Sequence, residues 1–140
     1  MAQLFAGGRK VRTIGVIGAG QMGAGIAQVA AASGYDVFLR DIDLGRAEQG
    51  KAGIEKRLKR AVDTGKLEAE AVPATLARIT PIADAEPLAG CDLVIEAATE
   101  REDIKRAIFK EVGALLGPTA ILASNTSSIP ITRLAQASID

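Results

Sequence analysis

The sequence predicts an α/β domain built on a doubly wound parallel sheet. Short apolar stretches alternate with longer stretches whose apolar residues recur at helical spacing, which is the order typical of parallel sheets with helical crossovers. The stretch 91–97 is apolar apart from Asp92 and Glu96, as expected of a parallel strand covered on both faces. With 140 residues, of which 48% are hydrophobic, the chain is long enough for one compact domain with its own core.

The expected elements follow a loose leader over residues 1–11, and the domain is expected over 12–140. Gly34 and Gly65 mark the ends of two helices, because glycine readily adopts the conformation found just beyond a helix C-terminus. Gly117-Pro118 ends a third helix. The expected strands cover residues 12–17, 36–40, 78–82, 91–97 and 120–123. The expected helices cover residues 21–33, 44–63, 66–77, 99–117 and the stretch from about residue 130.

Two of these helices, 44–63 and 66–77, form a helical hairpin inserted after the second strand. The helix that follows the fourth strand has a capping box, with Thr99 as the N-cap and Glu102 folding back on it. Helical spacing then predicts which side chains face the core. The expected core residues are Ala47, Ile54, Leu58, Ala61 and Val62 on the long helix, and Ile104, Ala107, Ile108 and Val112 on the later one.

Composition argues against several classes of function. Lys+Arg and Asp+Glu both number 17, so the net charge favours neither nucleic acid nor an anionic membrane, and aromatic residues for stacking bases are only 3%. No apolar run is long enough to span a bilayer. The single cysteine, Cys91, leaves no intrachain disulfide and is expected to be a buried structural thiol. We therefore expect a protein without a metal site in a reduced cytoplasmic setting, with a matrix location as the alternative.

The most specific motif joins the first expected strand to the first helix. A bare GxGxxG pattern is weak evidence in a chain with 15 glycines, but here a strand precedes it, a helix follows it, and Asp41 ends the next strand. This order is typical of a dinucleotide-binding turn, because the glycines let the backbone approach a pyrophosphate that faces the helix N-terminus. The motif comprises Gly18, Ala19, Gly20, Gln21, Met22 and Gly23.

Asp41 predicts which dinucleotide is bound. Its carboxylate is able to accept hydrogen bonds from both ribose hydroxyls and would repel a 2′-phosphate, which favours NAD over NADP. The neighbouring Arg40 weakens this preference, because an arginine there is able to reach such a phosphate.

Further polar residues follow the fourth and fifth strands, at the sheet edge where parallel sheets bind ligands. From the residues alone, each has an alternative reading. Glu100 is either a site residue or a first-turn charge that complements the helix dipole. Lys105 is either a site residue or an ordinary solvated lysine, and Ser127 or Ser128 is favoured as a helix cap over a catalytic residue.

Three segments together resemble a known family. IGVIGAGQMGAGIAQVAAASGYDV, DLVIEAATE and ILASNTSSIPIT are similar to the NAD-binding domain of the 3-hydroxyacyl-CoA dehydrogenases, including the bacterial 3-hydroxybutyryl-CoA dehydrogenases. The resemblance implies NAD as the cofactor, with Gly18–Gly23 around its pyrophosphate and Asp41 on its adenosine ribose. It also implies that Glu100 and Lys105 lie near the nicotinamide half, and that Ser127 contacts both the 3-oxygen of the substrate and the cofactor.

The sequence departs from the family pattern on the helical hairpin. Some relatives carry a Ser and a Lys there that touch the CoA moiety, and this chain has Arg57 and Thr64 at the corresponding positions. Despite this departure, Arg57 is a candidate contact for the phosphates of an acyl-CoA substrate. A solvated basic face, formed by Arg57 with Lys56, Lys59 and Arg60, is the favoured alternative.

The family oxidises (S)-3-hydroxyacyl-CoA to 3-oxoacyl-CoA, or runs the reverse reaction, with a His oriented by a Glu as the base. This chain has no histidine. The resemblance therefore implies the NAD-binding domain of a parent enzyme, without the C-terminal all-α domain that carries the dyad and the homodimer interface, and inactive alone. The alternatives are a stand-alone dinucleotide-binding module without catalysis, and another 3-hydroxyacid or L-gulonate-type dehydrogenase.

Overall fold

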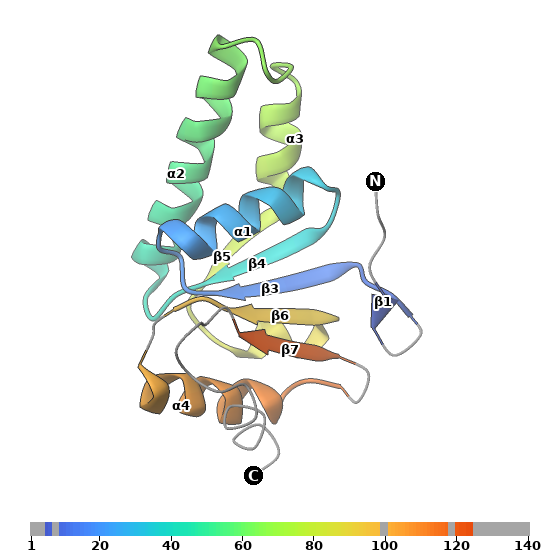
Figure 1. The fold of residues 1–140 in the computed structure, drawn as a ribbon, viewed down its shortest axis with the longest axis vertical. Helices are drawn as coiled ribbons and strands as arrows, with labels where there is room; N and C mark the ends of the chain where they lie inside the picture. Colours follow the sequence, from blue (N-terminus) through green and yellow to red (C-terminus); the bar gives the residue numbers. More distant parts are fainter. Residues whose placement is uncertain (1–4, 7–8, 99–100, 118–119, 125–140) are drawn as a thin grey trace.

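The computed structural model describes residues 5–6, 9–98, 101–117 and 120–124. Five parallel strands form one sheet in the order β5-β4-β3-β6-β7 (Figure 1). The chain runs outward from the central strand β3 to β5, returns to β6 on the other side of β3, and continues outward to β7. The predicted doubly wound sheet is thus confirmed. The strands are β3 Thr13–Ile17, β4 Asp36–Arg40, β5 Ile79–Ile82, β6 Leu93–Glu96 and β7 Ile121–Ser124.

Helices cover both faces of the sheet. Helix α1 and the hairpin of α2 and α3 lie on one face and α4 on the other (Figure 1). The hairpin follows β4, as predicted, and a short 3-10 helix, η1, precedes β6. No helix among these residues is long and apolar enough to cross a membrane. The helices are α1 Gln21–Ala32, α2 Leu44–Asp63, α3 Ala71–Ala77, η1 Glu86–Gly90 and α4 Glu102–Gly113.

Each face of the sheet has its own apolar core. On the α1 face, Val16 and Leu39 of the sheet pack with Ile54 of α2, and all three side chains are fully buried. On the α4 face, Val94 packs with Val112. Burying both faces of a parallel sheet is the main source of stability for this architecture, because apolar area removed from water contributes about 25 cal/mol per Å².

Several predicted boundaries differ from the observed ones. Helix α2 begins and ends as expected, whereas α3 begins only at Ala71 because the preceding residues form turns. Strand β6 is shorter than predicted, and β7 is shifted by one residue to end at Ser124. The expected loose leader contains a two-stranded hairpin of β1 Phe5–Ala6 and β2 Arg9–Lys10. The helix expected near residue 130 falls outside the described residues.

The predicted start of α4 was wrong. The helix begins at Glu102, and its N-cap is Arg101, whose side chain makes no capping hydrogen bond, so Thr99 is not the N-cap. The predicted buried face was also wrong in part. Val112 is buried, but Ile104 and Ala107 are exposed, and Lys105 and Phe109 take their place in the interior. Helical spacing alone did not show that the helix turns a lysine inward.

Candidate cofactor site

The turn after β3 needs glycine at two positions for steric reasons. Gly18 has φ +105°, and a Cβ there would lie 2.6 Å from the Cα of Ala98. A Cβ on Gly23 would lie 1.6 Å from the carbonyl oxygen of Gly18, so no side chain fits between the turn and α1. At Gly20, by contrast, no described atom lies within 4 Å of a Cβ position. Gly18 and Gly23 are thus required by the turn itself, and Gly20 leaves room for a ligand.

The N-terminus of α1 is suited to binding an anion. Its N-cap is Gly20, which has no side chain to accept a hydrogen bond, and the first turn contains no acidic residue. The first amides of a helix lack intrahelical partners, and they carry the positive end of the helix dipole. A pyrophosphate fits this arrangement.

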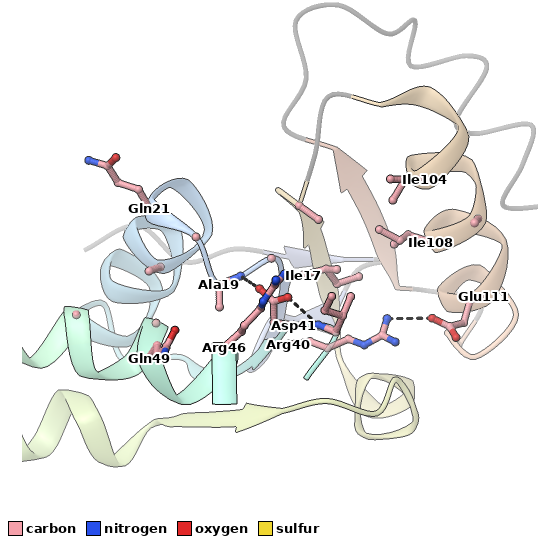
Figure 2. A pocket seen from close by; sticks show the side chains of 18 of the residues that line it. Ile17, Ala19, Gln21, Arg40, Asp41, Arg46, Gln49, Ile104, Ile108 and Glu111 are labelled. Carbon is pink, nitrogen blue, oxygen red and sulfur yellow. Dashed lines mark hydrogen bonds and ion pairs between the residues drawn. The ribbon is translucent and has the colours of Figure 1, made fainter. Parts of the chain in front are cut away.

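Asp41 is held against the glycine turn. One of its carboxylate oxygens, Oδ2, accepts a hydrogen bond from the amide of Ala19 at 2.9 Å, and Oδ1 accepts one from the amide of Ile42 at 2.7 Å (Figure 2). A carboxylate has about four acceptor sites, so two remain for hydroxyl donors. The carboxylate therefore lies beside the glycine turn and keeps acceptor sites that suit the hydroxyls of a ribose.

Arg40 is engaged elsewhere. Its Nε donates to the carbonyl oxygen of Ala83 at 2.9 Å, and its Nη1 forms an ion pair with Glu111 at 2.9 Å (Figure 2). The Arg40 side chain is only 16% exposed. A 2′-phosphate would have to compete with both contacts, so the geometry weakens the expected attraction of Arg40 for NADP.

The glycine turn opens onto a cavity of about 1090 Å³ that is large enough for a dinucleotide. Its far wall is the outer face of α4, where Ile104 and Ile108 point towards the turn (Figure 2). These are the residues that helical spacing assigned to the core. Ile104 is exposed to the cavity, whereas Ile108 is half-buried and also packs against the core on the α4 face. Sequence analysis missed this wall because a core face and a pocket wall have the same pattern.

Arg57 of α2 also lines the cavity. Its Nε donates to Oε1 of Gln28 at 2.8 Å, whereas its Nη2 is buried without a hydrogen-bond partner among the described residues. An unpartnered guanidinium nitrogen is costly to bury and suits an anionic ligand.

Two other predicted site residues, Met22 and Lys105, do not line this cavity. Met22 lies outside this cavity and lines a mainly apolar groove of about 900 Å³ between α1 and β6. Lys105 is fully buried, and its Nζ donates to Oε1 of Glu96 and, at 3.3 Å, to Oγ of Ser124. Glu100 and Ser127 lie outside the described residues. The first four residues of the motif, 18–21, thus share one cavity with Asp41 and Arg57, and Lys105 does not line it.

Cys91 has the buried structural position that was predicted. Its thiol packs in the core on the α4 face, and burial, together with the neighbouring Asp92, raises its pKa from 9.0 to about 12. At neutral pH the sulfur is therefore a protonated thiol, which is unreactive.

The strand order, the glycine turn and the acid at the end of β4 define a dinucleotide-binding domain of the Rossmann type. The chain belongs to the family described as "3-hydroxyacyl-CoA dehydrogenase, NAD binding domain", which matches residues 13–139.

Relatives of known sequence agree with this assignment. The 3-hydroxybutyryl-CoA dehydrogenase of Bradyrhizobium diazoefficiens is 51% identical over 127 residues, which cover 91% of this chain and 43% of that protein. A probable 3-hydroxybutyryl-CoA dehydrogenase of Deinococcus radiodurans is 52% identical, with 89% of this chain and 44% of that protein covered. The chain thus spans less than half the length of these relatives.

A solved structure has the same fold. The (S)-3-hydroxybutyryl-CoA dehydrogenase of Ralstonia eutropha superimposes with a TM-score of 0.88 at 42% identity, and the match covers 91% of this chain and 45% of that one. The family and the shared fold bear out NAD as the cofactor.

Proposed function

We propose that this chain is the cofactor domain of an enzyme that interconverts (S)-3-hydroxyacyl-CoA and 3-oxoacyl-CoA with NAD. The observation that carries the proposal is the position of Asp41, whose carboxylate is hydrogen-bonded to the amide of Ala19 within the glycine turn. When bound, NAD supplies the acceptor for the hydride that leaves C3 of the substrate. The relatives named for 3-hydroxybutyryl-CoA support this substrate class.

The chain's own residues have separate roles in this proposal. The amides at the start of α1 bind the pyrophosphate, and Asp41 binds the ribose and repels a 2′-phosphate. Ile104 and Ile108 present an apolar wall that suits the adenine ring. Arg57 offers its unpartnered Nη2 to a phosphate of CoA. Glu100 near the nicotinamide half and Ser127 on the 3-oxygen remain parts of the proposal.

Catalysis needs a base for the proton of the C3 hydroxyl, and this chain has no histidine. We infer that residues 1–140 bind NAD without turnover. In this proposal a longer parent protein carries the base, the helical domain and a homodimer interface. The parent is proposed to be cytoplasmic. The chain's match to less than half of its relatives supports this inference.

The test compares binding with turnover. The purified 140-residue chain is titrated with NADH and NADPH by fluorescence, and it is then assayed with 3-hydroxybutyryl-CoA and NAD. We expect NADH to bind more tightly than NADPH, with no steady oxidation. Sustained oxidation would disprove the inferred inactivity. A preference for NADPH would disprove the role of Asp41. If the reading frame continues past Asp140, the full-length protein is assayed as well. Oxidation of other 3-hydroxyacids only, and not of 3-hydroxybutyryl-CoA, would favour the alternative dehydrogenases.

A further inference from the structure

An ion pair joins the end of β4 to α4 beside the cofactor cavity. Nη1 of Arg40, the last residue of β4, is 2.9 Å from Oε1 of Glu111 on α4 (Figure 2). Both residues line the cavity, and Arg40 directly precedes Asp41, the acid proposed to bind the ribose. The pair therefore lies near the position at which NAD and NADP differ, because NADP carries its extra phosphate on that ribose.

The dipole of α4 does not favour an acid at position 111. The helix ends at Gly113, so Glu111 lies in its last turn, where a cation is stabilising and an acid is not. The Glu111 side chain is 52% exposed, so it is not needed to fill the core, and an exposed ion pair contributes little to stability. The contact with Arg40 is therefore the interaction that sets Glu111 apart.

Arg40 is held at two points. Its Nε donates to the carbonyl oxygen of Ala83 at 2.9 Å and its Nη1 donates to Glu111, so the guanidinium is directed towards α4 (Figure 2). These contacts use two of the five N–H donors of the guanidinium, whose planar fork is well suited to a phosphate. Without Glu111, Arg40 would keep one anchor at Ala83 and would be free to turn its remaining donors towards a 2′-phosphate.

We propose that Glu111 is a specificity-determining positioning residue, which reinforces the preference for NAD by holding Arg40 away from the 2′-position of the ribose. Asp41 disfavours a 2′-phosphate by repulsion. Glu111 disfavours it by occupying the arginine that would otherwise attract it, and it acts through Arg40 without touching NAD. This inference rests on the proposed ribose site at Asp41, and it adds a residue of α4 to the same selection.

A second arginine lies near the same site. Arg46 lines the cavity, and its Nε is 3.7 Å from Oδ2 of Asp43, with both side chains more than half exposed. Because this contact is long and exposed, Arg46 is held less firmly than Arg40. A gain in NADPH affinity on loss of Glu111 is therefore attributable to Arg40 only if the gain disappears when Arg40 is replaced.

A double-mutant cycle between Glu111 and Arg40 tests the proposal, with the NADH and NADPH affinities of the purified chain measured by fluorescence titration. Glu111→Ala removes the carboxylate and suits a helix. It should strengthen NADPH binding by about threefold to fivefold and change NADH binding by less than about twofold. In an Arg40→Met background the same substitution should change NADPH binding by less than about twofold. Glu48→Ala removes an exposed acid of α2 that does not line the cavity, and it should change neither affinity.

Three results would overturn the proposal. Unchanged NADPH affinity in Glu111→Ala would show that Arg40 does not reach the 2′-phosphate. An equal gain in the Arg40→Met background would assign the effect to direct repulsion by Glu111 or to attraction by Arg46. Weaker NADH binding in Glu111→Ala would show that Glu111 touches the cofactor itself.

An Asp41→Ala background keeps the test decisive if the unsubstituted chain binds NADPH too weakly to measure, because the repulsion by Asp41 is then absent. Glu111→Ala should again strengthen NADPH binding by about threefold to fivefold, and unchanged affinity there would overturn the proposal. The ribose site has a separate test, since Asp41→Ala alone alters the ratio of NADH to NADPH affinity only if Asp41 meets the ribose. An altered ratio in Asp41→Ala with no effect of Glu111→Ala would refute this inference and leave the proposed function standing.

Discussion

The carboxylate of Asp41 and the amide of Ala19 are 2.9 Å apart and hydrogen-bonded, although 22 residues separate them in the chain. Parallel pairing of β3 with β4 brings them together, because Ile17 is the register partner of Arg40 and the two strands end at the same edge of the sheet. The glycine turn and the acid that follows β4 are thus one structural unit, as the proposed binding of pyrophosphate and ribose requires.

This relationship predicts the effect of removing the acid. Asp41→Ala should weaken NADH binding by about tenfold to a hundredfold, because charge-assisted hydrogen bonds to the ribose contribute about 1.5–3 kcal/mol. NADPH should lose much less, since the repulsion of its 2′-phosphate is relieved at the same time. Fluorescence titration with both nucleotides measures the ratio. Asp43→Asn removes a nearby exposed carboxylate but keeps an N-cap for α2, and it should change neither affinity. Equal losses for NADH and NADPH in Asp41→Ala would refute the ribose role.

Gly20 should tolerate a methyl group in the free protein but not in the complex. Its φ of −69° suits any residue, and no described atom lies near the Cβ position. We expect Gly20→Ala to change the free energy of unfolding by less than about 1 kcal/mol, and to weaken NADH binding by about tenfold because the methyl occupies the approach of the pyrophosphate. Urea denaturation and NADH titration measure the two effects. Unchanged NADH affinity would place the pyrophosphate elsewhere.

Gly18 should behave in the opposite way. Gly18→Ala adds strain at a positive φ and a clash with the Cα of Ala98, and it should destabilise the fold by about 2–4 kcal/mol. Gly34 has a similar φ of +100° but open space, so Gly34→Ala reports the strain alone, about 1 kcal/mol. Denaturation of both variants isolates the cost of the close contact. Similar losses would mean that Ala98 moves away freely.

The apolar wall on α4 should matter for binding more than for folding. Ile104 is 39% exposed, so Ile104→Ser should lower the free energy of unfolding by only about 0.5 kcal/mol. NADH binding should weaken by about threefold to tenfold, because the ligand loses apolar contact. Val29→Ser alters a more exposed apolar residue of α1 outside the cavity and should leave NADH affinity unchanged. Equal affinity in both variants would show that NADH does not reach this wall.

Cys91 should give stability a specific dependence on pH. Its pKa is raised in the folded state, so its contribution is fully present below the unfolded pKa and is lost as the pH rises through the folded one, between 9.0 and about 12. Cys91→Ala removes this term, so its free energy of unfolding should fall less steeply than that of the unsubstituted chain above pH 9.0. If the free energies of unfolding of the two proteins fell equally steeply with pH in denaturation experiments, that result would contradict the raised pKa. The thiol should also resist disulfide reagents until the protein unfolds.

Local patterns predicted much of this protein. The limits of α2 and β4, the glycine turn and the acid at the end of β4 follow from hydrophobic periodicity, from glycine's access to positive φ and from the spacing of the dinucleotide motif. Each of these signals depends on residues near one another in the chain. The fold class could be predicted from the sequence as well. Strands that alternate with helices are joined by right-handed crossovers, and these allow only a few arrangements of the sheet.

Tertiary structure alone decided the orientation of α4. Helical spacing is compatible with two faces of this helix, and the sequence favoured the one with Ile104 and Ala107. In the folded chain a buried carboxylate on β6 draws Lys105 inward, since leaving Glu96 unpaired would cost more than exposing isoleucine. That long-range charge balance places Ile104 and Ile108 on the wall of the cofactor cavity.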